Sequence, residues 1–335
     1  MEGVSAGQAA CPLPVAEPLR ICGTASATLD RLMPVRRLIV NADDFGLTDG
    51  INRAVRDLHQ WGALTSTTLM AAAPRFHEAV EVSQRQKLLG VGCHIVLVDG
   101  TPICDPASIP TLLDASSDNS APRFRATLGE FIRDLHIGRI DSTQIEREAI
   151  AQILRLQQAG VTVTHVDMHK HTHMFPRVLK GVMRAAQVCN VRAIRNPFEP
   201  KWSVAATPGA GLVRTLEVRV LRTLRHSFWK LVRQQAFATT DGCIGVAATG
   251  TLNENTLQAL AHGLPEGIFE LVCHPAYVDE ELAATRTRLQ QSRQIEWEAL
   301  RTLPSILESL GFPVQFINFG GLSAIPSRES NGRTK

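Results

Sequence analysis

Short apolar runs alternate along the chain with longer segments in which apolar residues recur every three or four positions. The short runs are typical of strands buried on both faces, and the periodic segments predict amphipathic helices. We expect strands at Leu38–Val40, Thr65–Met70, Val91–Leu97, Val161–Asp167, Arg192–Arg195, Gly242–Val246, Ile268–Cys273 and Val314–Phe319. We expect helices from a cap at Asp49 to about Gly62 and at Phe76–Lys87, Ser142–Ala159, Pro176–Cys189, Gly209–Gln235, Asn253–His262 and Ala283–Leu310.

This alternation predicts an α/β protein, because repeated strand–helix units build parallel sheets. The simplest closed form is a TIM-like (β/α) barrel, here a single domain over residues 35–322 with inserted helices. Residues 98–125 contain four prolines and predict a long loop. Residues 1–34, rich in Ala, Gly, Pro and Ser, predict a disordered extension, and 323–335 a polar tail. Met33 precedes the first strand, so we expect the functional chain to begin near it, which an intact mass of natively expressed protein tests.

Composition narrows the class of protein. The 335 residues are 44% hydrophobic and 20% charged, as in soluble globular chains, and a net charge of +3 is too small to indicate nucleic acid as a partner. Seven scattered cysteines without a CxxC pair favour a reduced, cytoplasmic setting over a disulfide framework. No uncharged apolar run reaches the length of a membrane span.

Two adjacent acids, Asp43 and Asp44, follow directly on the first predicted strand. Buried parallel strands deliver side chains to their carboxyl ends, where α/β sheets and barrels place their chemistry. Adjacent acids are also common as turn residues or helix caps. Two neighbouring carboxylates stay charged only if a cation or strong hydrogen bonds compensate them. A metal that holds one of them leaves the other free as a base, so the pair is compatible with a metal-dependent hydrolase.

Histidines follow two further predicted strands. His94 ends one of them, where a lone histidine is more often structural. The other is followed by a cluster within nine residues, formed by His165, Asp167, His169, His171 and His173. Alternate side chains of an extended chain share a face, so the first three project together, and the last two continue that face only if the strand does. Carboxylates and imidazoles are ligands of a divalent metal that keeps a position open for water; a metal-scavenging histidine tract is the alternative.

A third histidine, His274, ends the strand at Ile268–Cys273, and Pro275 restricts it to an extended conformation. This geometry suits a residue held at the rim of a barrel, although a histidine that merely closes a strand fits equally well. Arg192 and Arg195 stand at another strand end, where they could bind a carboxylate or a substrate oxygen. A solvated or structural arginine is the default interpretation at that position.

Four motifs, in the same order, resemble the YdjC/ChbG family of carbohydrate deacetylases over nearly all of residues 35–322. They are Asn41-Ala42-Asp43-Asp44-Phe45-Gly46, Gly92-x-His94-x-x-Leu97, His165-x-Asp167-x-His169-x-His171-x-His173 with Pro176, and Cys273-His274-Pro275. The resemblance implies a distorted TIM-like (β/α) barrel of the glycoside hydrolase/deacetylase type, one divalent metal ion (Mg or Zn) at the strand ends, and removal of an acetyl group from an N-acetylated amino sugar.

The same resemblance implies roles for individual residues. Asp44, His94 and His169 correspond to the metal ligands, Asp43 to the catalytic base and His274 to the general acid that protonates the leaving amine. The remaining polar residues of the motifs are expected to orient the ligands or to contact the sugar: His165, Asp167, His171 and His173.

A basic tract stands apart from these motifs. Its apolar residues recur at helical spacing: Leu212, Leu216, Val220, Leu224, Phe228 and Leu231. Around them lie Arg214, Arg219, Arg222, Arg225, Lys230 and Arg233. One interpretation is a helix packed on the barrel with a solvated basic back. The other is an interfacial helix on the anionic inner face of the plasma membrane, with Trp202 and Trp229 at the headgroup level.

Within the family, the chain is most similar to the hopanoid-biosynthesis members called HpnK. This similarity comes from Arg-x-x-Arg-x-Pro-x-Glu-Pro at Arg192–Pro200, the inserted basic tract and Phe316–Gly320. It implies a substrate with a sugar headgroup on a membrane lipid, N-acetylglucosaminyl hopanoid. A soluble chito-oligosaccharide deacetylase, for instance one acting on diacetylchitobiose, is the main alternative. A nucleic-acid-binding protein and a non-catalytic metal-binding protein are the other two, and the sequence leaves the oligomeric state open, a homodimer included.

Overall fold

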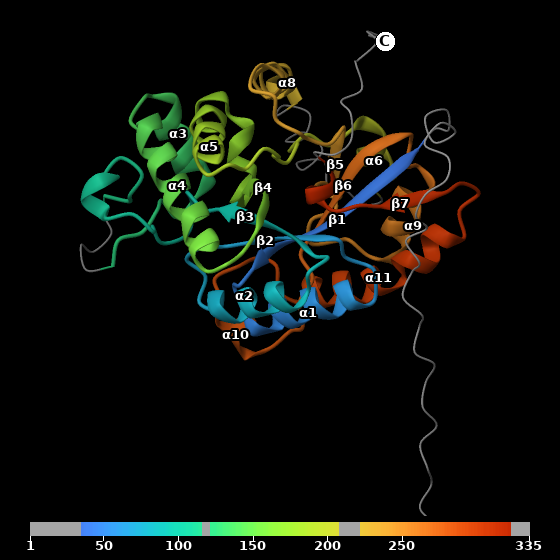
Figure 1. Cartoon of the computed structure of the whole chain (residues 1–335). Helices are drawn as coiled ribbons and strands as arrows, with labels where there is room; N and C mark the ends of the chain where they lie inside the picture. Colours follow the sequence, from blue (N-terminus) through green and yellow to red (C-terminus); the bar gives the residue numbers. More distant parts are fainter. Residues whose placement is uncertain (1–34, 116–120, 208–221, 323–335) are drawn as a thin grey trace, which may run out of the picture. The chain divides into compact units, whose positions relative to one another are not determined.

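Parallel strands form one curled sheet in the computed structural model, which describes residues 35–115, 121–207 and 222–322 (Figure 1). In these ranges the strands are β1 (Arg36–Phe45), β2 (Ser66–Leu69), β3 (Gly90–Ile95), β4 (Val163–Met168), β5 (Gly242–Ile244), β6 (Gly267–Cys273) and β7 (Val314–Phe316). Their order is β4-β3-β2-β1-β6-β5, and β7 pairs with the first residues of β1, before β2 begins to pair. The predicted α/β fold is confirmed. Residues 1–34 and 323–335, predicted to be an extension and a tail, lie outside the described ranges.

Single parallel bridges continue the sheet beyond β4. Val166 of β4 bridges Ile194, and Ala193 bridges Ala238, which shortly precedes β5. The strand predicted at Arg192–Arg195 is therefore present only as isolated bridges. These bridges extend the curled sheet from β4 toward the residues just before β5, and the sheet is therefore a distorted half-barrel.

Helices cover the outside of this sheet, with α1, α2, α10 and α11 below the strands in Figure 1 and α3, α4 and α5 at the upper left. Their bounds are α1 (Asp49–Gln60), α2 (Phe76–Arg85), α3 (Leu128–His136), α4 (Ser142–Gln158), α5 (Pro176–Val188), α6 (Lys201–Ala206), α8 (Arg225–Gln234), α9 (Glu254–His262), α10 (Glu280–Ala284), α11 (Gln291–Glu308) and α12 (Phe319–Leu322). The described residues also form the short 3₁₀ helices η1 (Pro106–Ser108), η2 (His169–Met174) and η3 (Arg222–Leu224).

Two helix predictions need correction. The cap of α1 is Thr48 rather than Asp49, because the Thr48 hydroxyl accepts a hydrogen bond from the backbone N–H of Ile51. The single helix predicted at Ala283–Leu310 is two helices, α10 and α11, and the residues between them line a cavity. Helical periodicity alone could not detect this break, because Arg and Thr are tolerated inside helices.

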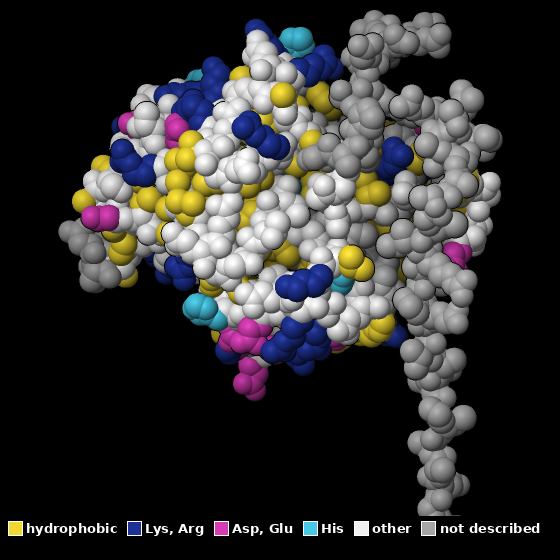
Figure 2. All heavy atoms as spheres, in the orientation of Figure 1, with side chains coloured by type: hydrophobic (Ala, Val, Ile, Leu, Met, Phe, Trp, Pro, Cys, Tyr) yellow, Lys and Arg dark blue, Asp and Glu magenta, His cyan; other side chains and the backbone are white. Residues whose placement is uncertain are grey.

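The described part of the basic tract, α8, packs on the barrel. Phe228 and Val232 are buried, and the Phe228 ring lies 5.6 Å from that of Phe198. Trp229 also packs against the core rather than pointing outward, with Arg233 over its ring. Figure 2 shows basic side chains at the top, where Figure 1 places α8.

The outward basic residues of α8 are Arg225, Lys230 and Arg233. Arg214 and Arg219, also predicted to belong to a membrane-facing helix, lie outside the described residues, as does the side chain of Arg222. Within the described ranges, none of the helices combines the length and the apolar character needed to cross a bilayer.

Tight packing inside the barrel at Gly92 of β3 yields a stability prediction. A Cβ atom on Gly92 would lie 2.5 Å from the ring of His165, and that ring is stacked on Phe319 with centroids 3.7 Å apart. Because the ring cannot move aside, Gly92→Ala should lower the free energy of unfolding by about 1–3 kcal/mol. Gly129→Ala in α3, where a Cβ meets no atom within 4 Å, should be neutral or slightly stabilising. Urea unfolding measures both, and equal midpoints would contradict the packing described.

Candidate metal centre and catalytic site

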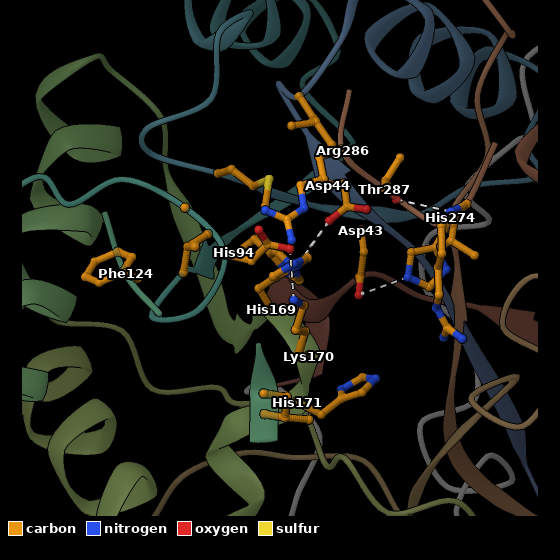
Figure 3. A pocket seen from close by; sticks show the side chains of 18 of the residues that line it. Asp43, Asp44, His94, Phe124, His169, Lys170, His171, His274, Arg286 and Thr287 are labelled. Atoms are coloured by element: carbon orange, nitrogen blue, oxygen red, sulfur yellow. Dashed lines mark hydrogen bonds and ion pairs between the residues drawn. The ribbon is translucent and has the colours of Figure 1, made fainter. Parts of the chain in front are cut away.

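Polar side chains from four strands meet at the carboxyl end of the sheet (Figure 3). Asp43 and Asp44 belong to the end of β1 and His94 to β3, while His169 follows β4 and His274 follows β6. Parallel strands of a barrel point their carboxyl ends the same way, so residues far apart in sequence gather there. All five line one cavity.

The two adjacent aspartates face the same side because β1 is irregular at this point. In a regular strand, neighbouring side chains point to opposite faces. Here the register of β1 against β2 shifts between Ala42 and Phe45, and Asp44 has a φ of 63°, in the left-handed region. Such a bulge redirects a side chain at the end of a strand. It therefore brings both carboxylates to the cavity.

Three ligand atoms converge beside Asp44. Its Oδ1 lies 3.4 Å from His169 Nδ1 and 3.7 Å from His94 Nε2, and the two imidazole nitrogens are 3.3 Å apart. Ligand atoms around a tetrahedral zinc ion are about 3.4 Å from one another. Asp44 Oδ1 is also buried without a hydrogen-bond partner among the described residues, which a bound cation would remedy. These three side chains therefore fit a divalent metal ion.

The far side of the His94 ring is fixed by Asp167. His94 Nδ1 lies 2.8 Å from Asp167 Oδ1 and 3.2 Å from the Thr68 hydroxyl, which leaves Nε2 for the cation. A carboxylate behind a histidine ligand orients the ring and raises its basicity. Burial alone would lower the pKa of His94, but Asp167 together with Asp43 and Asp44 raises it to about 9. The same negative surroundings attract a metal cation.

A fully buried guanidinium, that of Arg195, joins the acids of the site. It donates to both oxygens of Asp43 at 2.6 and 2.8 Å, and it lies 2.5 Å from Asp167 and 2.8 Å from Glu270. Burial would raise the pKa of Asp43, but Arg195 outweighs it and holds that pKa far below its usual range. Glu270 shares its cation with two other acids, and burial raises its pKa to about 7.

His274 lies on the other side of Asp43. Its Nε2 is 3.9 Å from Asp43 Oδ2, and its backbone N–H donates to Glu296 of α11 at 2.6 Å. Burial lowers the pKa of His274 to about 4, although both aspartates oppose the shift. Burial likewise raises the pKa of Glu296 to about 7. His274 is therefore neutral at neutral pH in this state of the protein.

The other predicted site residues are divided between the cavity and the layers behind it. His171 lines the cavity, next to Lys170, and both residues have left-handed backbone conformations that end the extended face of β4. His173 is buried, with Nε2 3.2 Å from the carbonyl oxygen of Arg195, and His165 stacks on Phe319 inside the barrel. Arg192 is exposed and is not among the cavity-lining residues.

The cavity has a volume of about 1590 Å³. Apolar side chains from the segment before and within α3 line one part of it, among them Phe124, Leu128 and Ile132. Two arginines of the α10–α11 connection, Arg286 and Arg288, line another part. Figure 3 shows Phe124 well separated from His274, with the metal-ligand candidates between them. Pockets for small molecules typically have volumes of about 300–1,000 Å³. This cavity is larger and extends beyond the polar centre.

Sequence reasoning missed several residues that touch the centre. Thr68, Glu270, Arg293 and Glu296 contact the predicted site residues directly. Glu270 carried a signal, because it is an acid within the otherwise apolar strand Gly267–Cys273, and a buried acid requires a partner. No such signal marked Arg293 and Glu296, because in a helix with many charged residues the sequence does not distinguish the charged residues that point inward from those that face solvent.

Comparison with known proteins identifies relatives of this chain. The family model described as YdjC-like protein matches residues 37–305. A carbohydrate deacetylase of Geobacillus stearothermophilus is 31% identical over 276 residues, which cover 82% of this chain and 93% of that protein. A carbohydrate deacetylase of Thermoanaerobacter pseudethanolicus is 31% identical over 74% of this chain and 84% of its own length. A chitooligosaccharide deacetylase of Yersinia pestis is 28% identical, with 73% and 83% covered.

The fold also has a counterpart among solved structures. A crystal structure of a putative cellobiose-phosphate cleavage protein from Enterococcus faecalis superposes with a TM-score of 0.66. The match covers 86% of this chain and 99% of that protein at 23% identity. It therefore supports the fold, and the function must be argued from the site.

The buried neutral histidine His173 predicts a pH effect on stability. Burial and nearby Arg195 lower its pKa to about 3 from an ordinary 6.5. Between these values the unfolded chain binds a proton that the folded protein does not, so this contribution to stability is lost as pH falls. The loss is at most about 1.4 kcal/mol per pH unit.

In His173→Gln this contribution is absent, so the variant should gain stability relative to the wild type as pH falls from 6.5 to 4. Urea unfolding of both proteins at several pH values gives the difference between their free energies of unfolding. Other groups titrate alike in the two proteins, so their contributions cancel in this difference. A difference that stays constant with pH would contradict a buried neutral His173.

Proposed function

The chain belongs to the YdjC-like family, and from that premise we propose that it is a metal-dependent hydrolase that removes the acetyl group from an N-acetylated amino sugar. The observation that carries the proposal is the convergence of Asp44, His94 and His169 within 3.3–3.7 Å beside Asp43 and His274. Relatives at 31% identity named carbohydrate deacetylase support this activity.

The residues suited to hold the metal are Asp44, His94 and His169. When bound, a divalent ion would polarise the acetamide carbonyl and activate water for attack. Two imidazole nitrogens and one carboxylate oxygen are a donor set that suits zinc, whereas magnesium prefers oxygen ligands. We therefore favour zinc over magnesium as the native ion.

The positions of Asp43 and His274 suggest a path for the proton. Asp43 takes the proton as water attacks the carbonyl carbon. Oδ2 of Asp43 lies on the side of His274 Nε2, so the proton can pass from the carboxyl group to the imidazole. His274 then gives the proton to the amine nitrogen as the C–N bond breaks. The gap of 3.9 Å between them exceeds a hydrogen bond, as is common in catalytic sites without substrate.

We further propose that the substrate is a glycolipid, N-acetylglucosaminyl hopanoid, with the sugar at the metal centre. A cavity of about 1590 Å³ with an apolar wall at Phe124, Leu128 and Ile132 supports an apolar group attached to the sugar. The exposed basic residues of α8 would then rest on anionic headgroups at the inner face of the membrane. A soluble chito-oligosaccharide is the second candidate, supported by the relative from Yersinia pestis.

Acetate release separates these substrates. Zinc-loaded and magnesium-loaded protein is incubated with anionic vesicles that carry N-acetylglucosaminyl hopanoid, and separately with diacetylchitobiose. We expect release from the hopanoid, with protein sedimenting alongside the vesicles. Release from diacetylchitobiose alone would assign the chain to soluble oligosaccharides. Release from neither would contradict the hydrolase, and would favour a metal-binding role if metal is still bound, or a nucleic-acid-binding role if binding to DNA falls with salt.

Removal of the base tests the division of roles between the two aspartates. Asp43→Asn preserves shape, so the metal should stay bound while the turnover rate falls by about 10²–10⁴-fold. Metal content by mass spectrometry and the rate of acetate release are measured on the same sample. Asp44→Asn is the matched comparison and should lose metal affinity. If Asp43→Asn lost the metal instead, the roles of the two residues would be reversed.

A further inference from the structure

The two oxygens of Asp44 have different surroundings. Oδ1 faces His94 and His169 and has no hydrogen-bond partner among the described residues. Oδ2 lies 2.5 Å from a guanidinium nitrogen of Arg293 in α11. One oxygen of the carboxylate is thus occupied by a cation of the chain itself, and the other is left for the metal ion.

Arg293 is held from several directions. Its side chain is 1% exposed, and its Nε donates to the backbone oxygen of Leu289 at 3.1 Å. A second nitrogen donates to the backbone oxygen of His274 at 3.4 Å, and the backbone oxygen of Arg293 accepts from the N–H of Ala276 at 3.2 Å. The planar guanidinium therefore cannot swing away without breaking contacts to two other segments.

These contacts join the two halves of the centre. The segment His274–Ala276 is bound at both of its ends to Arg293, which also binds the carboxylate of Asp44. Three residues further along α11, Glu296 accepts the backbone N–H of His274. Asp44 itself has a strained left-handed backbone, which persists only where surrounding contacts enforce it.

We propose that Arg293 is a positioning residue that restricts Asp44 to a single metal-facing oxygen and couples this ligand to the segment that carries His274. The inference rests on the proposed function in that it takes Asp44 as a metal ligand. In this role Arg293 acts through Asp44 and not on the reacting atoms. Its effect is on the affinity and the coordination geometry of the metal site.

Zinc affinity tests this role without any deacetylase assay. Arg293→Gln removes the charge and the fork of donors, so the dissociation constant for Zn²⁺, measured by competition with a chromophoric chelator, should rise about 10–100-fold. Arg293→Lys keeps the charge with one compact donor and should recover part of the loss. Arg301→Gln, the same change at an exposed position of α11, is the control and should bind Zn²⁺ as the wild type does. A folded Arg293→Gln protein with wild-type affinity would overturn the proposal.

Cobalt spectroscopy supplies a readout that a purely structural role would not change. Co²⁺ in the wild type and in Arg301→Gln should give the same visible absorption, whereas a freed Asp44 carboxylate should alter its intensity through a changed coordination number. If Arg293→Gln does not fold, Arg293→Lys is judged by the same two measurements, and wild-type affinity with a wild-type spectrum would refute the inference.

The wild type separates this inference from the proposed function. Zn²⁺ binding without acetate release from either substrate would contradict the deacetylase and leave the role of Arg293 standing. Acetate release with unchanged metal binding in both Arg293 variants would contradict only the role of Arg293.

Discussion

Compensation of buried negative charge is the constraint on which this structure depends. Arg195 and Arg293 are almost fully buried and are shared among the acids at the ends of β1 and β4 and an acid in the middle of β6. An ion taken out of water costs several kcal/mol unless it is paired, so each of these carboxylates needs its cation. The two guanidinium groups are shared by the four acids Asp43, Asp44, Asp167 and Glu270. Three of these acids surround His94, where the candidate ligand atoms meet.

The same constraint distinguishes the surroundings of two neighbouring residues. Both oxygens of Asp43 accept hydrogen bonds from Arg195, and Oδ1 also accepts from Asn41 and Thr68, so this carboxylate keeps its charge and its orientation. Asp44 accepts a hydrogen bond from Arg293 at one oxygen only. The number of oxygens that bind an arginine therefore distinguishes Asp43, the candidate base, from Asp44, the candidate ligand.

The candidate polar centre and the cavity beyond it are formed by different parts of the fold. The strand ends carry the polar centre, whose side chains are locked by buried hydrogen bonds. The cavity beyond it is formed by connections such as the segment before α3 and the one between α10 and α11. Barrels commonly vary such loops while the rim stays constant. This arrangement explains why motifs can indicate the reaction class more directly than the substrate.

The sequence by itself determined the strand–helix alternation and most strand positions, because burial periodicity is a local pattern. It also placed polar residues at the strand ends, and the resemblance of its motifs to a family implied which of them are the candidate ligands and acid–base residues. Only the tertiary structure decided which histidines of the cluster reach the cavity, because two left-handed residues after His169 end the extended chain. It alone also assigned Arg195, Arg293 and Glu296 to their partners. These pairings join residues more than 20 positions apart, up to 249 for Asp44 and Arg293, and no local pattern encodes which buried acid a distant arginine will meet.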